Sequence, residues 1–380
     1  MIKIKSAMAR AMKRSSARNL SAANRLVQAT LAANLPGGLP SGMARRSMAR
    51  GKVGLAALEA LQKSMPSITT PPVTPPTKPA KTSSKAAKPR VPSTKGRFAA
   101  HRYSGPEGSL DYWLYLPPQA LEGLPVVVML HGCTQNPEDF ARGTGMNVLA
   151  DELGLIVAYP AQPASANMNK CWNWFRPSDQ QRGGGEPALI AAMTGAIVAD
   201  TGADKARVYV AGLSAGGAAA AILGAAYPDV YAAIGVHSGL ACGAASDVMS
   251  AFSAMRSGPG TARGQARQGR FVPVITFHGD SDATVHAVNS ARIIADASGH
   301  IGSPLTVTSE TGSSDAGRTF TRETSQGADG TVQIEQWTIH GAGHAWSGGT
   351  DAGTYTDASG PDASRAMIAF FLQHRQPEPS

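Results

Sequence analysis

The sequence predicts an α/β protein with a mostly parallel central sheet and helices on both faces. Apolar segments of strand length alternate along the chain with segments of helical pattern, which is typical of this class. Glycine-containing loops follow several of the predicted strands. A hydrophobic content of 42% in 380 residues supplies enough apolar surface for one large core.

The elements can be placed coarsely from these patterns. Strands are expected over 109–116, 126–130, 154–159, 208–211, 231–236, 272–277 and 331–339, the first of them antiparallel to its neighbour. Helices are expected over 137–153, 187–201, 214–227, 285–298 and 362–374. Residues 299–330 are expected to add an excursion with short strands at 305–310 and 318–323.

The charge of the chain is concentrated in an N-terminal extension. The first hundred residues hold 19 of the 35 basic residues and one of the 26 acidic residues, Glu59. They carry a net charge of +18, and the remainder carries −9. Residues 1–65 have the pattern of short amphipathic helices, and residues 66–98 have the Pro-, Thr- and Lys-rich composition of a disordered linker. The folded domain is therefore expected over 99–376.

A basic extension predicts adhesion to an anionic surface, such as a polymer granule or membrane lipid, and a purely solubilising extension is the alternative. No specific nucleic acid is expected as a partner, because the extension has no aromatic residue to stack on bases before Phe98. No apolar run is long enough to span a membrane, so no transmembrane segment is expected. The sequence also shows no apolar signal region, which favours a cytoplasmic location.

A candidate nucleophile lies in Gly212-Leu213-Ser214-Ala215-Gly216, between a predicted strand and an alanine-rich helix. A serine on a sharp strand-to-helix turn needs small neighbours, because the turn is crowded and its backbone strained. The strain directs the hydroxyl to where a substrate can reach it. The motif predicts Ser214 as the nucleophile, with chance occurrence in a chain rich in Gly and Ala as the alternative.

A serine hydroxyl needs a base that takes its proton and a third group that orients the base. Asp282 follows an apolar strand, and His344 lies in a glycine loop after the last predicted strand. Because α/β-hydrolases supply these residues in the order Ser, acid, His, the sequence predicts Asp282 as the acid and His344 as the base. Asp280 and His340 are the competing candidates, and either aspartate has an alternative role as a helix N-cap.

The oxyanion of an acyl-transfer intermediate needs backbone N–H donors. In this fold one donor follows the nucleophile, which makes it Ala215. The other comes from the loop after the third strand, where the sequence reads His131-Gly132-Cys133. The Cys133 amide is therefore predicted as the second donor, with an ordinary strand-ending turn as the alternative.

Together, several longer motifs resemble the poly(3-hydroxybutyrate) depolymerase family of esterases, which is similar to acetylxylan and feruloyl esterases. They are His131–Gln135, Cys171–Phe175, Arg182–Ala188, Ala211–Gly217 and His237–Leu240. The resemblance covers residues from about 100 to 375 and implies an α/β-hydrolase fold and ester cleavage through an acyl-enzyme. It carries over Ser214, Asp282 and His344 as the triad, with Cys133 and Ala215 as oxyanion donors.

The resemblance leaves the substrate open. Short-chain hydroxyalkanoate esters are expected, acylated polysaccharide is the alternative, and a non-catalytic polymer-binding module is a third interpretation. No cofactor is expected. The family also makes an extracellular location an alternative to the cytoplasmic one.

Tryptophans mark a candidate substrate pocket. Trp172 and Trp174 lie in the long loop before the helix 187–201, where they are predicted to form an apolar wall beside the nucleophile. Trp346, close to His344, is a further candidate. The alternative for each is ordinary packing.

The cysteines and the paired histidines leave further questions of chemistry. Cys133, Cys171 and Cys242 cannot all pair with one another; Cys133–Cys171 is the first disulfide to test, Cys171–Cys242 is the second, and free thiols are the default without a signal sequence. His340 and His344 could suggest metal ligands. No metal is expected, because glycines between them oppose a helix and no third ligand is evident.

Overall fold

The structure, a computed structural model, describes residues 94–259 and 270–377. Its strands are β1 (Arg97–Gly105), β2 (Gly108–Leu116), β3 (Val126–Leu130), β4 (Ile156–Pro160), β5 (Val208–Leu213), β6 (Ala233–His237), β7 (Val274–Gly279), β8 (Thr306–Ser313), β9 (Thr319–Gln326), β10 (Val332–Ile339), β11 (Trp346–Ser347) and β12 (Thr356–Asp357). Its helices are α4 (Pro137–Thr144), α5 (Met146–Leu153), η1 (Pro177–Asp179), α6 (Gly185–Thr201), α7 (Ala215–Ala226), α8 (Val248–Ser257), α9 (Val288–Ser298) and α10 (Ala363–Phe371).

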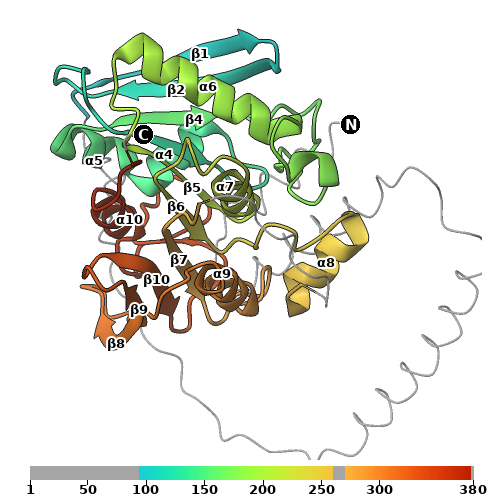
Figure 1. The fold of residues 1–380 in the computed structure, drawn as a ribbon, viewed down its shortest axis with the longest axis vertical. Coiled ribbons are helices and arrows are strands. Elements are labelled where there is room, and N and C mark those ends of the chain that lie inside the picture. The colour runs from blue at the N-terminus through green and yellow to red at the C-terminus, as the bar shows by residue number, and fades with distance from the viewer. Residues whose placement is uncertain (1–93, 260–269, 378–380) are drawn as a thin grey trace, which may run out of the picture. The chain divides into compact units, whose positions relative to one another are not determined.

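One ten-stranded sheet organises these elements, in the order β1-β2-β4-β3-β5-β6-β7-β10-β9-β8 (Figure 1). The neighbours from β4 to β10 are parallel, and the outer pairs β1–β2 and β9–β8 are antiparallel hairpins. The predicted α/β class with a mostly parallel sheet is confirmed. Because the central strands run in one direction, their carboxyl ends share one edge, where such sheets bind ligands.

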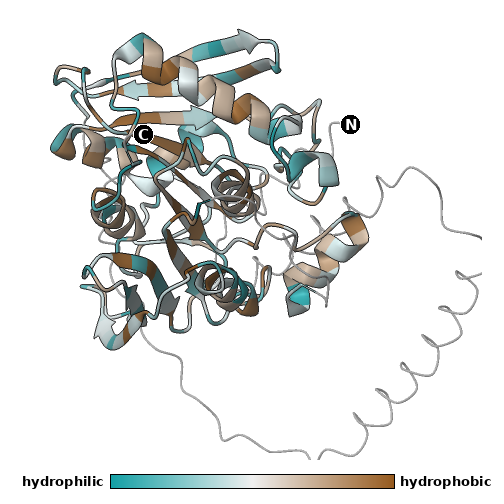
Figure 2. Ribbon diagram, in the orientation of Figure 1, coloured by the Kyte–Doolittle hydropathy of each residue, from teal (hydrophilic) through white to brown (hydrophobic). Residues whose placement is uncertain are grey.

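Helices cover both faces of the sheet (Figure 1), and a separate apolar cluster lies between the helices and the strands on each face. On one face, Ile190 of α6, Leu223 of α7 and Ile293 of α9 pack against the strands. On the other, Leu149 of α5 and Met367 of α10 do the same. Figure 2 shows the apolar residues gathered in the central strands, which are buried on both sides.

The N-terminal boundary differs from the prediction. The predicted extension over 1–65 lies outside the described residues, as does most of the predicted linker over 66–98. The last residues of that linker are nevertheless ordered, because β1 begins at Arg97 and pairs along its whole length with β2. Phe98 packs on Trp113 of β2 and on Tyr159 of β4, with ring centroids 4.9 and 5.6 Å apart, so both strands supply apolar contacts that hold β1.

Two other features differ from the sequence-based expectation. The helix expected over 137–153 is broken into α4 and α5 at Gly145, whose φ of 65° ends α4 and whose N–H donates to the Ala141 carbonyl. Helix α8 was not expected, although Asp247 and Ser250 form a capping box at its start. Among the described residues, no helix combines the length and the apolar character needed to cross a bilayer.

Candidate active site

Ser214 lies on a sharp turn between β5 and α7. Its backbone has φ 58° and ψ −117°, a strained conformation for a residue with a side chain. A Cβ atom on Gly216 would lie 2.0 Å from the Leu130 carbonyl oxygen, and one on Gly212 would lie 2.3 Å from the Gly216 carbonyl carbon. Only glycine therefore fits at these positions, and the structure has the crowded turn that the motif predicts.

Asp282 and His344 form a hydrogen-bonded pair. His344 Nδ1 and Asp282 Oδ2 are 2.7 Å apart, and the two side chains are 8% and 0% exposed. Asp282 Oδ1 accepts the N–H groups of Thr284 and Val285, at 2.8 and 2.9 Å. Burial alone would raise the pKa of Asp282, but the attraction and hydrogen bonding of His344 and the other donors hold that pKa below its ordinary value. The pair is thus an ionised carboxylate that orients an imidazole.

A second imidazole, His278 at the end of β7, supports this carboxylate. His278 Nε2 lies 2.8 Å from the Val285 carbonyl oxygen, so this nitrogen carries the proton and donates it. The same nitrogen is 3.5 Å from Asp282 Oδ2. Burial lowers the pKa of His278, which keeps the ring neutral. The sequence did not single out this residue.

His237 connects the turn at Ser214 to the segment that follows His344. Its carbonyl oxygen accepts the Ser214 N–H at 2.9 Å, and its ring Nε2 accepts the Ser347 N–H at 2.9 Å. The ring stacks on Trp346, with centroids 5.0 Å apart. Burial holds the pKa of His237 well below its ordinary value, so Nε2 stays an acceptor. The resemblance included His237 but gave it no role.

The fold directs Ser214 and His344 to the same edge of the sheet. Ser214 follows β5 and His344 follows β10, and both strands belong to the parallel centre. Ser214 is partly exposed. Within the described residues no hydrogen bond joins its hydroxyl to His344, so the third contact of the triad stays a prediction. Catalytic hydrogen bonds of this kind are often long before substrate binds.

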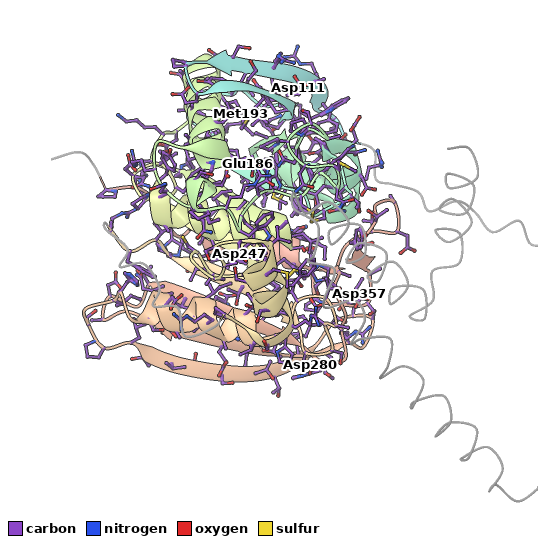
Figure 3. All side chains as sticks on the ribbon, turned by 90° about the vertical axis from the view of Figure 1, so that its right-hand side faces the viewer. Asp111, Glu186, Met193, Asp247, Asp280 and Asp357 are labelled. Atoms are coloured by element: carbon purple, nitrogen blue, oxygen red, sulfur yellow. A yellow bond between two sulfur atoms is a disulfide. The ribbon has the colours of Figure 1, made fainter. Side chains whose placement is uncertain are left out.

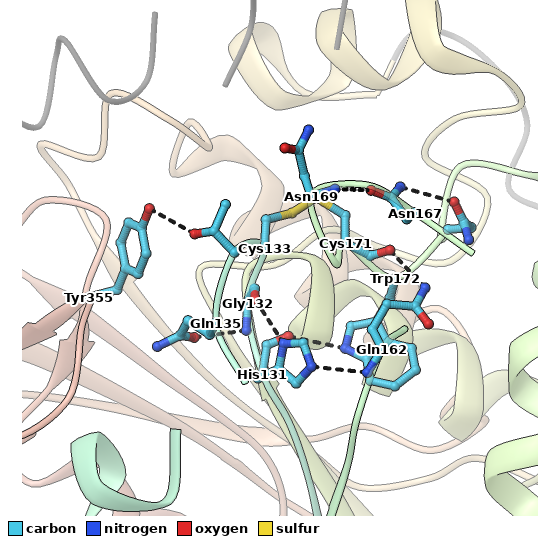
Figure 4. Close-up of a disulfide and its surroundings, with 12 residues drawn as sticks. His131, Gly132, Cys133, Gln135, Gln162, Asn167, Asn169, Cys171, Trp172 and Tyr355 are labelled. Atoms are coloured by element: carbon cyan, nitrogen blue, oxygen red, sulfur yellow. Dashed lines mark hydrogen bonds between the residues drawn. A yellow bond between two sulfur atoms is a disulfide. The ribbon is translucent and has the colours of Figure 1, made fainter. Parts of the chain in front are cut away.

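A disulfide fixes the loop after β3. Cys133 and Cys171 are bonded, with their Cα atoms 4.2 Å apart, which is the first of the two pairings considered (Figure 4). The default of free thiols is therefore wrong for these two residues, because the chain folds Cys171 back over the end of β3. Cys242 is not part of this disulfide.

The amides on either side of Cys133 are hydrogen-bonded. The Gly132 N–H donates to Gln135 Oε1 at 2.9 Å (Figure 4), and the Thr134 N–H donates to the Asn169 carbonyl oxygen at 2.6 Å. These bonds hold the loop on both sides of Cys133.

The tryptophans predicted to line a pocket are buried. Trp172, Trp174 and Trp346 are 1%, 6% and 1% exposed, which leaves almost no ring surface for a substrate. The indole N–H of Trp172 donates to the His131 carbonyl oxygen at 3.1 Å. The burial does not support an apolar wall and matches the alternative of ordinary packing.

The competing residues Asp280 and His340 form a pair of their own. His340 Nδ1 and Asp280 Oδ2 are 3.0 Å apart, and each side chain is 40% exposed. His340 Nε2 lies 2.9 Å from the Thr321 hydroxyl. In the part of the chain that the structure describes, no group of three or more His, Cys, Asp or Glu residues is arranged to hold a metal ion.

Comparisons with known proteins extend these observations. A family model described as Esterase PHB depolymerase matches residues 110–325. Poly(3-hydroxyalkanoate) depolymerase C of Paucimonas lemoignei is 34% identical over 247 residues, 62% of this chain and 58% of that protein. Feruloyl esterase B of Thermothelomyces thermophilus is 35% identical over 144 residues, 38% of this chain and 48% of that protein. The chain thus spans about half the length of these relatives.

Among solved structures, an acetyl xylan esterase from Aspergillus awamori is similar to this chain. The TM-score is 0.56 at 20% identity, and the match covers 72% of this chain and 99% of that one. At this identity the likeness shows the fold alone, which is the α/β-hydrolase fold.

Proposed function

The chain belongs to the Esterase PHB depolymerase family, and from this premise we propose that it is a serine hydrolase that cleaves carboxylic esters through an acyl-enzyme. The observation that carries the proposal is the buried pair of His344 and Asp282 at the sheet edge that also presents Ser214. Fold alone would not assign a reaction, because the same fold hosts many.

The proposed reaction has two steps, and His344 moves the proton in both. In the first step, His344 Nε2 takes the Ser214 proton while the oxygen attacks the ester carbonyl carbon. The ester C–O bond then breaks, and the same proton goes to the leaving alcohol. In the second step, His344 takes a proton from water, whose oxygen attacks the acyl-enzyme carbonyl carbon. The bond between that carbon and Ser214 Oγ then breaks, His344 returns the proton to Oγ, and the acid leaves.

The proposed oxyanion donors are the amides of Cys133 and Ala215. Ala215 is the first residue of α7, and an N–H in the first turn has no partner within the helix. Gly132 and Thr134, on either side of Cys133, already use their amides within the protein. The Cys133 amide is therefore the donor of this loop that can serve a substrate oxygen.

For the substrate, we propose short-chain esters of hydroxyalkanoic acids, as the name of the Paucimonas lemoignei relative indicates. Acylated polysaccharide is the second candidate, which the feruloyl esterase relative favours. Release of 3-hydroxybutyrate from its oligomers, compared with release of acetate or ferulate from acylated xylan, separates the two.

The basic extension is proposed to hold the enzyme on an anionic surface, and removal of residues 1–95 should then weaken binding to such a surface without changing turnover of a soluble ester.

The replacement Ser214→Ala tests the reaction. Hydrolysis of p-nitrophenyl acetate and butyrate should fall by on the order of 10³-fold or more in kcat. Ser257→Ala, at the exposed end of α8, is the matched control and should keep full activity. Wild-type protein that hydrolyses neither ester, or an unchanged Ser214→Ala variant, would contradict the proposal.

A further inference from the structure

Glu186, in the first turn of α6, is a largely buried carboxylate that the proposed mechanism does not use (Figure 3). Three donors converge on it. Its Oε1 accepts the side-chain amides of Gln162 and Asn173, at 2.5 and 2.6 Å, and its Oε2 accepts the Asn173 backbone N–H at 2.7 Å. Short hydrogen bonds to an ionised acceptor are among the stronger ones in proteins.

The groups that Glu186 holds are themselves bonded to the loop after β3 (Figure 4). The Gln162 backbone N–H donates to His131 Nε2 at 3.2 Å, and its side chain donates to the Cys171 carbonyl oxygen at 2.8 Å. Asn173 follows Trp172, whose indole donates to the His131 carbonyl oxygen at 3.1 Å. His131, the first residue of the His131-Gly132-Cys133 segment, is therefore held by two hydrogen bonds. Gln162 bonds to its ring, and Trp172 bonds to its carbonyl oxygen.

The covalent connection to Cys133 comes from the same segment. Cys171, whose carbonyl the Gln162 side chain holds, forms the disulfide with Cys133. We propose that Glu186 is a positioning residue for the oxyanion hole. Glu186 fixes the Cys133 amide through Gln162, Asn173 and the disulfide. This inference rests on the proposed function, because it concerns the same reaction.

An ionised carboxylate suits this place better than a neutral amide. A carboxylate only accepts hydrogen bonds, so it can serve all three donors, whereas glutamine would turn its NH₂ group toward one of them. Asp179 is the acid beside it and accepts the Glu186 N–H at 2.8 Å. Burial and the negative charge of Asp179 raise the pKa of Glu186, and the hydrogen bonds from Gln162 and Asn173 lower it. The net effect is a pKa above the ordinary value of a glutamate.

The pH consequence follows from these charges. As the pH falls, Glu186 takes up a proton earlier than an exposed glutamate, and the protonated group loses an acceptor and gains a donor. On the loop side, burial and the nearby Lys170 lower the pKa of His131 to about 4, so His131 stays neutral over the same range. The acid side of the kcat profile should therefore include the protonation of Glu186.

The replacement Glu186→Gln tests the proposal with p-nitrophenyl butyrate. A displaced oxyanion donor weakens the transition state and spares substrate binding, so kcat should fall about tenfold or more, with KM within about twofold. Phenylboronic acid, which adds to a catalytic serine as a tetrahedral anion, should bind more weakly by a similar factor. Glu186→Gln should also lack the additional ionisation on the acid side of kcat.

The matched control is Glu335→Gln. Glu335 is a buried carboxylate that accepts from Arg322 at 3.0 and 3.1 Å and from Trp337 at 2.7 Å, away from the loop after β3. Its loss should lower the temperature of unfolding while kcat per folded molecule stays unchanged. Gln162→Met is the second test variant, should Glu186→Gln fail to fold, and it should lower kcat in the same way.

Two results would overturn the proposal. One is an active wild type for which Glu186→Gln or Gln162→Met lowers the temperature of unfolding but leaves kcat, phenylboronic acid affinity and the acid side of the pH profile unchanged. The other is a change in KM alone. A wild type without esterase activity would instead contradict the proposed function.

Discussion

Two aspartate–histidine pairs connect the loops after β7 and β10, and they differ mainly in burial. Asp282 and His344 are 2.7 Å apart with side chains 0% and 8% exposed. Asp280 and His340 are 3.0 Å apart with side chains 40% exposed. Asp280 is labelled in Figure 3, at the surface. The residue types and the contacting atoms are the same, so the proposed difference in function must come from the surroundings.

The surroundings decide what each imidazole can still do. His340 uses its second nitrogen as well, on the Thr321 hydroxyl at 2.9 Å. For His344 the hydrogen bond within the described residues is to Asp282, on Nδ1, and Nε2 is the nitrogen proposed to serve the serine and substrate. The buried carboxylate is also fixed by backbone amides, and water does not compete for it. A catalytic pair thus needs a rigid acid and a second nitrogen that the protein does not use.

The largest expected difference between the pairs is the effect of removing each imidazole. His344→Gln should lower kcat for p-nitrophenyl butyrate by on the order of 10⁶-fold, because the base itself is lost. His340→Gln should leave kcat within about threefold, since surface changes away from the site have small effects. Similar losses in the two variants would show that the comparison assigns the base wrongly.

The next difference concerns the acids. Asp282→Asn keeps the size of the side chain but favours the wrong tautomer of His344, and kcat should fall by up to about 10⁴-fold, the loss that this change causes in a serine-protease triad. Asp280→Asn should change kcat by less than about threefold. The pH dependence of kcat in each purified variant checks this, and equal losses would remove Asp282 from its role.

The sequence predicted the parts of this site whose signals are local. Ser214 stands out because the glycines that its turn requires are two residues away on either side, and Gly216 indeed has no room for a Cβ. Asp282 and His344 could be chosen because each follows a strand of clear apolar pattern. Asp280 and His340 share that position, so the sequence ranked the pairs without showing which is buried.

Other features depend on contacts between distant segments and had no local signal. His237 bonds to Ser347, which is 110 residues further along the chain. Glu186 was part of a motif, yet the role proposed for it depends on Gln162, 24 residues before it. Strand β1 was not predicted as a strand, and its first two residues were assigned to the linker; the pairing with β2 along its whole length defines it. Long-range packing thus overrides local composition at these places.

Burial also predicts a difference in how histidines affect stability with pH. Burial lowers the pKa of His374 to about 4, and Nε2 of this residue has no partner among the described residues. The unfolded chain, with an ordinary pKa of about 6.5, binds the proton first, so the free energy of unfolding falls as the pH drops from about 6.5 to 4. Full stability from this group is present above about pH 6.5.

His374→Leu should therefore make the loss of stability over this pH range smaller, by up to about 1.4 kcal/mol per pH unit. Urea unfolding between pH 7 and 4.5 measures the slope. Ser257→Ala, an exposed position without a titratable group, is the control and should leave the slope unchanged. An unchanged slope in His374→Leu would contradict the role of burial.

The smallest expected effect is the contribution of the exposed pair to stability. A double-mutant cycle with Asp280→Asn and His340→Gln should give a coupling of about 0–1 kcal/mol in the free energy of unfolding at pH 6, as exposed ion pairs do. The coupling should shrink further at about 1 M NaCl, where the screening length falls to about 3 Å. A salt-insensitive coupling of several kcal/mol would mean that Asp280 and His340 are held as tightly as the buried pair. Asp280 and His340 would then have to be treated as part of the catalytic framework, because a rigid Asp280 carboxylate beside the loop after β10 would help to fix His344.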